Sequence, residues 1–177
     1  MTSEREARRA FHYAKTAGMS IIIGAPDHGL LDLCHVLVRE TGISLAIHNH
    51  GPGDKLYPTP RSVLERIAGY DPRVGLCLDV GHTFRIGVDP AAAAREAGVR
   101  LLDVHLKDVT EASPAGEEVE VGRGVIDIPG LGRALFDMRF SGTSAFGYEK
   151  DPKDPLPGLA ESVGYVKGVL KGSGLNI

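Results

Sequence analysis

The ten residues LAIHNHGPGD, at positions 45–54, join an apolar run to two histidines and a glycine-rich end. The apolar residues predict a buried strand, and Gly-Pro-Gly predicts the turn that follows it. Side chains along a strand alternate between its two faces, so His48 and His50 point the same way while Asn49 points the other way. The histidine pair therefore shares one surface at the end of this strand.

On either side of this stretch, the chain alternates helical segments with apolar runs that predict strands starting near residues 20, 44, 74, 101 and 144. Thr59 and Asp89 each precede a proline at a predicted helix start, and Gly42 and Gly98 mark helix ends. The runs are continuously apolar, as in parallel strands covered on both faces. We predict one α/β domain over residues 1–177, with an extended loop at 110–124.

Composition narrows the class of protein. The chain has 177 residues, 42% of them hydrophobic, and it contains no apolar run near the roughly 18 residues of a membrane span. A net charge of −3 gives no general attraction for a phosphate backbone, so a nucleic-acid partner is not expected. Two cysteines, Cys34 and Cys77, imply no disulfide framework, and the first ten residues lack a secretory apolar region. We expect a cytoplasmic protein.

Polar side chains gather at the carboxyl ends of successive predicted strands, where parallel α/β folds build their sites. They are His48, His50, Asp79, His82, His105, Lys107 and Glu149. Each has an ordinary alternative, because a strand-end Asp or His more often caps a helix and a strand-end Lys more often lies at the surface. Four such strand ends in succession predict a shared polar centre.

Imidazole and carboxylate groups are ligands for Mn, Co, Zn, Mg or Fe, so the set predicts a divalent cation without selecting one. Lys107 could neutralise an oxyanion or a phosphate. Arg123 lies between two glycines in a predicted loop, and it could bind a phosphate or carboxylate or be a solvated loop arginine.

Four motifs, in this order and spacing, resemble the C-terminal part of the xylose isomerase-like TIM barrel superfamily of sugar-phosphate isomerases and epimerases: LAIHNHGPGD, GLCLDVGH, LLDVHLKD and GRGVID. The similarity runs from about residue 19 to 169. The resemblance implies a (β/α)₈ barrel with a divalent metal. It matches Asp79 and His105 to metal ligands, His82 to a substrate-side histidine, and Glu149 to the glutamate of the last strand.

The chain departs from the family pattern in two places. His48 stands where many members have a ligating glutamate, and Gly147 is an alternative match for the last-strand glutamate. The expected metal ligands are therefore His48, Asp79, His105 and Glu149. If Gly147 is the matching position, one ligand is missing.

The length is a third departure, because a complete barrel takes about 250 residues and eight strands. The resemblance implies a partial (β/α)₈ TIM barrel of about five parallel βα units, the fourth to the eighth, with the first three absent. Such a sheet has two open edges. We therefore expect a homo-oligomer or association with a missing N-terminal half.

The implied activity is a metal-dependent isomerisation or epimerisation of a sugar or sugar phosphate through an enediolate. Glu149 is the expected base, with His48 or His50 as its partner, while His82, Lys107 and Arg123 would hold substrate oxygens. Three alternatives remain open: a non-catalytic barrel fragment, a phosphodiesterase of the endonuclease IV type, and a lyase of the inosose dehydratase type.

Overall fold

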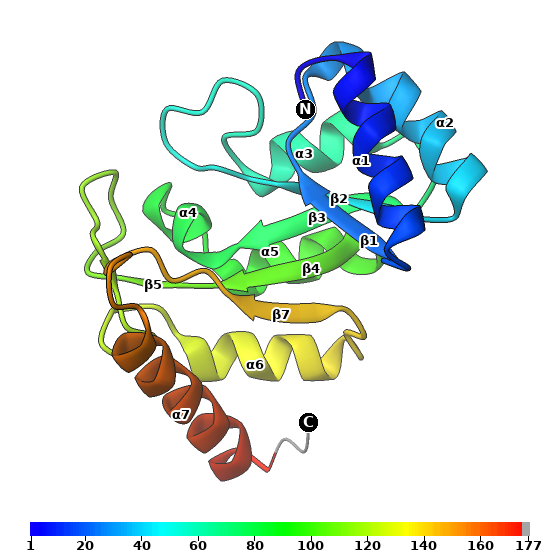
Figure 1. The fold of residues 1–177 in the computed structure, drawn as a ribbon. Helices are drawn as coiled ribbons and strands as arrows, with labels where there is room; N and C mark the ends of the chain where they lie inside the picture. Colours follow the sequence, from blue (N-terminus) through cyan, green and yellow to red (C-terminus); the bar gives the residue numbers. More distant parts are fainter. Residues whose placement is uncertain (175–177) are drawn as a thin grey trace.

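The computed structural model describes residues 1–174, which form a five-stranded parallel sheet with helices packed along it (Figure 1). Its strands are β1 (Ile21–Gly24), β2 (Ser44–His48), β3 (Val74–Asp79), β4 (Leu101–Leu106) and β7 (Thr143–Phe146). They hydrogen-bond in the order β1-β2-β3-β4-β7, so spatial order follows chain order. The sheet curls as a section of a barrel does, which confirms the predicted α/β class and the five parallel strands.

Helices join the strands. They are α1 (Glu4–Thr16), α2 (Leu31–Thr41), α3 (Pro60–Ile67), α4 (Val80–Arg85), α5 (Pro90–Ala97), α6 (Ile128–Asp137) and α7 (Leu156–Gly172), with short 3₁₀ turns at His28–Leu30 and Gly98–Arg100. Within the described residues, no helix combines the length and apolar character that crossing a bilayer requires.

The helix boundaries follow the signals in the sequence. The Thr59 side chain accepts the Ser62 N–H at 2.9 Å, and the Asp89 carboxylate caps α5 in the same way. Gly42 and Gly98 end α2 and α5 with φ of 76° and 53°, a region that a residue without a Cβ enters easily. All four predicted boundaries are confirmed.

The hydrophobic core lies between the sheet and the helices. Strand residues Leu45, Ile47, Leu76, Leu78 and Val104 are fully buried in it. Because side chains alternate along a strand, residues between these positions point to the opposite face of the sheet. That opposite face carries the polar residues of β3 and β4, and we call it the site face.

The predicted extended loop at 110–124 contains structure of its own. Residues Asp108–Val109 (β5) pair antiparallel with Glu118–Val119 (β6). The Asp108 carboxylate, 1% exposed, then accepts four backbone N–H groups at 2.9–3.1 Å, two on each oxygen. The donors are Val109 and Ile126 on Oδ1, and Gly122 and Gly124 on Oδ2. The Asp108 side chain therefore fixes the backbone of the connection between β4 and α6 at four points.

The two edges of the sheet are β1 and β7, each paired on one side only within residues 1–174. Figure 1 shows β1 beside α1 and α2, and β7 beside α6. Both edges belong to the same continuous sheet that carries the site.

Candidate functional site

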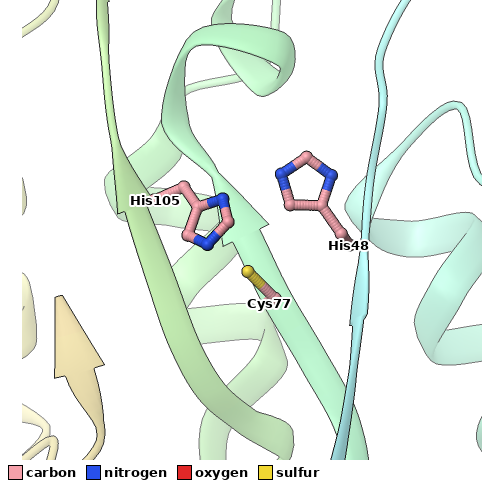
Figure 2. Close-up of side chains that lie close together, drawn as sticks. All are labelled: His48, Cys77 and His105. Atoms are coloured by element: carbon pink, nitrogen blue, oxygen red, sulfur yellow. The ribbon is translucent and has the colours of Figure 1, made fainter. Parts of the chain in front are cut away.

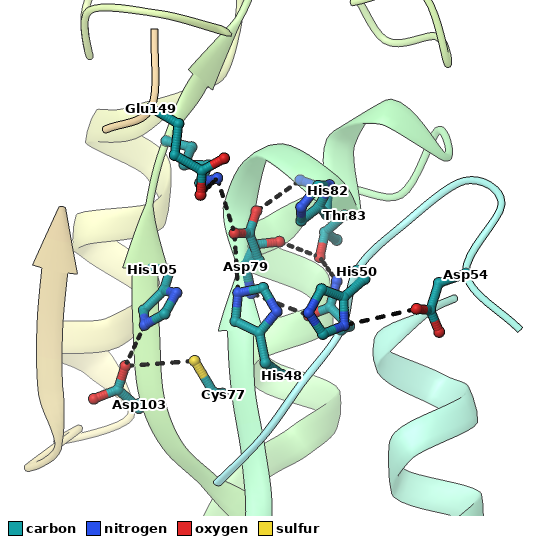
Figure 3. A network of polar contacts seen from close by, with 12 residues as sticks. His48, His50, Asp54, Cys77, Asp79, His82, Thr83, Asp103, His105 and Glu149 are labelled. Atoms are coloured by element: carbon teal, nitrogen blue, oxygen red, sulfur yellow. Dashed lines mark hydrogen bonds and ion pairs between the residues drawn. The ribbon is translucent and has the colours of Figure 1, made fainter. Parts of the chain in front are cut away.

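Six side chains come together at the carboxyl ends of β2, β3 and β4, and we call them the strand-end cluster (Figure 3). They are His48, His50, Asp79, His82 and His105, which Figure 3 labels, and Lys107, whose ammonium lies 3.7 Å from Asp79. Two register pairs explain the convergence: His48 lies beside Cys77, and Asp79 lies beside His105. Neighbours in parallel register share a face, so the sheet itself places these groups on the site face.

The imidazole rings pack closely around His48. Its ring centroid lies 4.5 Å from that of His50, 4.8 Å from that of His105 and 6.0 Å from that of His82. The sequence-based expectation that His48 and His50 share one surface is met by this geometry.

Asp79 is at the centre of the cluster and is fully buried. Its Oδ1 accepts the backbone N–H of His82 at 2.8 Å and so caps α4. Its Oδ2 lies 3.2 Å from His48 Nε2 and 3.7 Å from Lys107 Nζ, yet within the described residues it has no hydrogen-bond partner of good geometry. Asp79 is therefore both a helix cap and a buried carboxylate oxygen directed into the site.

Asn49, between the two histidines, fixes this arrangement from the other side. Its Oδ1 accepts the backbone N–H of Asp79 at 3.0 Å, and its Nδ2 donates to Thr83 Oγ1 at 3.1 Å. Thr83 in turn donates to the Asp79 carbonyl at 2.6 Å. The His-Asn-His order thus presents two rings to the site and one amide to the neighbouring strand. Sequence analysis had not assigned this amide a role.

Lys107 is a buried cation, 6% exposed. Burial alone lowers the pKa of its amine, but Asp79, Glu118 and Glu149 together outweigh that effect and leave the pKa raised. The corresponding distances from Nζ are 3.7, 3.6 and 3.1 Å. The amine is therefore protonated, and the resulting ammonium lies next to the site residue Asp79. Glu118, delivered by β6, was not among the predicted site residues.

Gly147 and Glu149, the two candidates for the last-strand glutamate position, have different surroundings in the structure. A Cβ added at Gly147 would lie 2.6 Å from Lys107 Cε, so the missing side chain leaves the room that Lys107 occupies. Glu149 has a side chain that is 76% exposed, and its Oε1 accepts from Lys107. Its carboxylate faces the lysine rather than the imidazoles.

The charges of the cluster follow from burial. Burial lowers the pKa of His50, His82 and His105, so their rings are neutral and carry a free nitrogen lone pair. Burial alone would raise the pKa of Asp79, but the opposing effect of His48, His82 and Lys107 is larger. The pKa is therefore lowered overall, and the carboxylate is ionised. Neutral imidazole and ionised carboxylate are the forms that bind metal.

A second donor set combines two members of the cluster with Cys77, which lies one row deeper in the sheet (Figure 2). Ligand atoms of His48, Cys77 and His105 all lie within 4.8 Å of one another. Cys77 is fully buried, and its thiol donates to Asp103 Oδ1 at 3.5 Å. Sequence analysis considered Cys77 only as a disulfide partner, although its position two residues before Asp79 places it on the same face. With the unpartnered Asp79 Oδ2, these donors fit a divalent cation.

Arg123 lies elsewhere. Its guanidinium makes two hydrogen bonds with Glu161 of α7, at 2.5 and 2.7 Å, and lies 3.8 Å from Glu120. Within the described residues it has no ion pair with the strand-end cluster. A cavity of about 930 Å³ also lies apart from the cluster, between α6, α7 and β7, and its lining is mainly apolar.

Comparisons with known proteins agree with the fold. A family model described as xylose isomerase-like TIM barrel matches residues 28–169. The rhizopine catabolism protein MocC of Rhizobium meliloti is 28% identical over 135 residues, which cover 68% of this chain and 41% of MocC. The chain thus aligns with less than half the length of that relative.

Two solved structures superpose well. A D-tagatose 3-epimerase-like protein has a TM-score of 0.79 at 18% identity, covering 94% of this chain and 68% of the other. The IOLI protein, solved with a bound zinc atom, has a TM-score of 0.76 at 18% identity, covering 96% and 68%. At these identities the likeness concerns the fold. With the family model matching most of the chain, the protein belongs to the xylose isomerase-like TIM barrel family.

Proposed function

We propose that this chain carries the site of a metal-dependent isomerase or epimerase acting on a small sugar or sugar phosphate. The observation that carries the proposal is the buried Asp79 Oδ2, which lies 3.2 Å from His48 Nε2 and 3.7 Å from the Lys107 ammonium and, within the described residues, has no hydrogen bond of good geometry. Family membership, and relatives named for sugar epimerisation and for rhizopine catabolism, support the substrate class.

The residues proposed to hold the cation are His48, Asp79 and His105; Glu149, whose carboxylate faces Lys107, would have to turn away from the lysine to serve as the fourth ligand. Mn, Co, Mg, Zn and Fe all remain candidates, and a structural neighbour was solved with zinc. Such an ion supplies Lewis acidity, which polarises a carbonyl oxygen and makes the neighbouring carbon-bound proton easier to remove.

The chain's own groups supply the rest of the chemistry. The protonated Lys107 is placed to neutralise negative charge that develops on a substrate oxygen, and the low-dielectric surroundings strengthen that interaction. The neutral rings of His50 and His82 can each accept a proton or bind a sugar hydroxyl. Glu149 is the proposed base, with an exposed carboxylate that can reach substrate entering from the site face.

The edge strands β1 and β7 bear on whether the site can exclude water. In a closed barrel, walls on all sides exclude water from the site. We propose that β1 and β7 pair with further strands in the working enzyme, supplied by a second copy or by the N-terminal three βα units of a complete barrel. Light scattering on the purified chain measures the first arrangement, and co-expression with a three-unit N-terminal half measures the second.

The deciding experiment is a turnover assay with added divalent metal over a panel of aldoses, ketoses and their phosphates. Lys107→Met keeps the length of the side chain and removes its charge, and we expect turnover to fall about 10²-fold or more. Lys153→Met, on an exposed lysine, is the matched control and should retain full activity. Equal activity of the two variants would refute the role of Lys107, and no turnover in any assembly state would refute the function.

A non-catalytic, metal-binding barrel section is the second candidate. It is favoured by the contact of Glu149 with Lys107 in place of the imidazoles. Metal bound at one equivalent without turnover on any substrate of the panel would select it.

A further inference from the structure

We infer that Cys77, His48 and His105 form a thiolate-containing site for a thiophilic divalent cation such as Zn²⁺, one row deeper in the sheet than Asp79. The inference rests on the proposed function only in sharing His48 and His105 with that site. It concerns a donor that the metal chemistry proposed above does not use, the sulfur of Cys77.

Strand register places the sulfur. Cys77 pairs with His48 across β2 and β3, while Asp79 pairs with His105 across β3 and β4. Cys77 lies two positions before Asp79 in the same strand, so both side chains point to the site face in successive rows. The His48 and His105 rings have centroids 4.8 Å apart, and the sulfur lies next to the gap between them (Figure 2).

The distances suit a cation. The three ligand atoms lie within 4.8 Å of one another. Tetrahedral zinc, with bonds of about 2.0–2.3 Å, holds its donors about 3.3–3.7 Å apart. The required contraction is on the order of 1 Å, which rotations of the two imidazoles can supply without moving the strands. Two neighbouring atoms, Asp79 Oδ2 and His48 Nδ1, are buried without hydrogen-bond partners in the described part of the chain.

Asp103 gives the thiol proton a destination. The Cys77 thiol donates to Asp103 Oδ1 at 3.5 Å, and the same oxygen lies 3.6 Å from His105 Nε2. On metal binding, the S–H bond breaks, the sulfur electron pair forms the bond to the cation, and the proton passes to the Asp103 carboxylate. The step involves no oxidation or reduction. The resulting set of two nitrogens and one sulfur favours zinc, cobalt or cadmium over magnesium.

The test uses Co²⁺ as a spectroscopic substitute for Zn²⁺, added to the full chain under reducing conditions. Sulfur bound to cobalt gives a thiolate-to-metal charge-transfer absorption in the near ultraviolet, which nitrogen and oxygen ligands do not give. We expect this band in the wild type at one equivalent of cobalt. Cys77→Ser should abolish the band and weaken Zn²⁺ binding at least about tenfold.

Cys34→Ser is the matched control, because Cys34 is the other buried cysteine and lies on α2. A band that survives in this variant comes from Cys77, even if Cys77→Ser fails to fold. Cobalt bound without the band overturns the inference and leaves the Asp79 site standing, whereas absence of cobalt binding overturns both. A Cys77-dependent band in a chain without turnover supports the inference and counts against the isomerase.

Discussion

Replacing Asp108 by Asn tests how the connection over the site face is held. In the structure, each carboxylate oxygen of Asp108 accepts two backbone N–H groups, and the side chain is 1% exposed. Asn retains one acceptor oxygen and places an NH₂ group against the other two donors. One pair of backbone N–H groups, either Gly122 and Gly124 or Val109 and Ile126, then loses its acceptor. At about 1–3 kcal/mol for each unsatisfied buried donor, we expect a loss of about 2–6 kcal/mol in the free energy of unfolding.

The chain offers a matched control in Asp54. This carboxylate also orders a loop, but one oxygen, Oδ1, accepts both the Leu56 and Tyr57 N–H groups, at 2.8 and 2.6 Å. Asn can preserve both bonds, so Asp54→Asn should cost less than about 1 kcal/mol. Urea unfolding of the two variants and the wild type measures the difference. Amide hydrogen exchange at one of the two donor pairs, Gly122 and Gly124 or Val109 and Ile126, should accelerate in the Asp108 variant alone. Equal unfolding midpoints for the two variants would refute the reasoning.

Three further predictions follow from the structure. Gly147→Ala puts a methyl group 2.6 Å from Lys107 Cε, so the lysine side chain must shift, and we expect near-normal stability but about 10²-fold lower turnover. Gly69→Ala, whose added methyl group meets nothing within 4 Å, is the control and should keep full activity. Thr59→Ala removes the cap of α3 and should lower the free energy of unfolding by about 1 kcal/mol in denaturant titrations; a change near zero would contradict the cap assignment. The metal-free chain should lose stability as pH falls below 6.5. Burial lowers the pKa of three imidazoles of the strand-end cluster in the folded state, so the unfolded chain binds protons at a higher pH than the folded chain does. Unfolding midpoints that do not change as pH falls would contradict this.

Local signals in the sequence predicted most of the fold. Apolar runs located five strands, and caps such as Thr59 and Asp89 located helix starts, because both depend on residues close together in the chain. The convergence of strand-end residues was also predictable, since parallel strands place their carboxyl ends together. The role of Cys77 was not, because it depends on the register of β2 against β3, which no local pattern encodes.

Other parts of the site depend on long-range docking. Glu118 reaches Lys107 only through the β5–β6 pairing, and the sequence at 110–124 has no strong strand pattern. Arg123 was a candidate to hold a substrate oxygen, but Glu161 of α7 lies beside it and pairs with its guanidinium. Such contacts join residues roughly 10 to 40 positions apart, so periodicity and capping carry no information about them.

Lys107 gives the site a counter-ion of its own. Its ammonium lies within 4 Å of carboxylate oxygens of Asp79, Glu118 and Glu149, so one positive charge from the chain offsets part of the negative charge of these three groups. Small metallo-domains such as zinc fingers stay unfolded until the metal binds, because the unfolded chain holds no preformed site. In the proposed metal site, by contrast, Lys107 and the buried core are in place without a cation, so the proposal implies a chain that folds first and binds its cation afterwards.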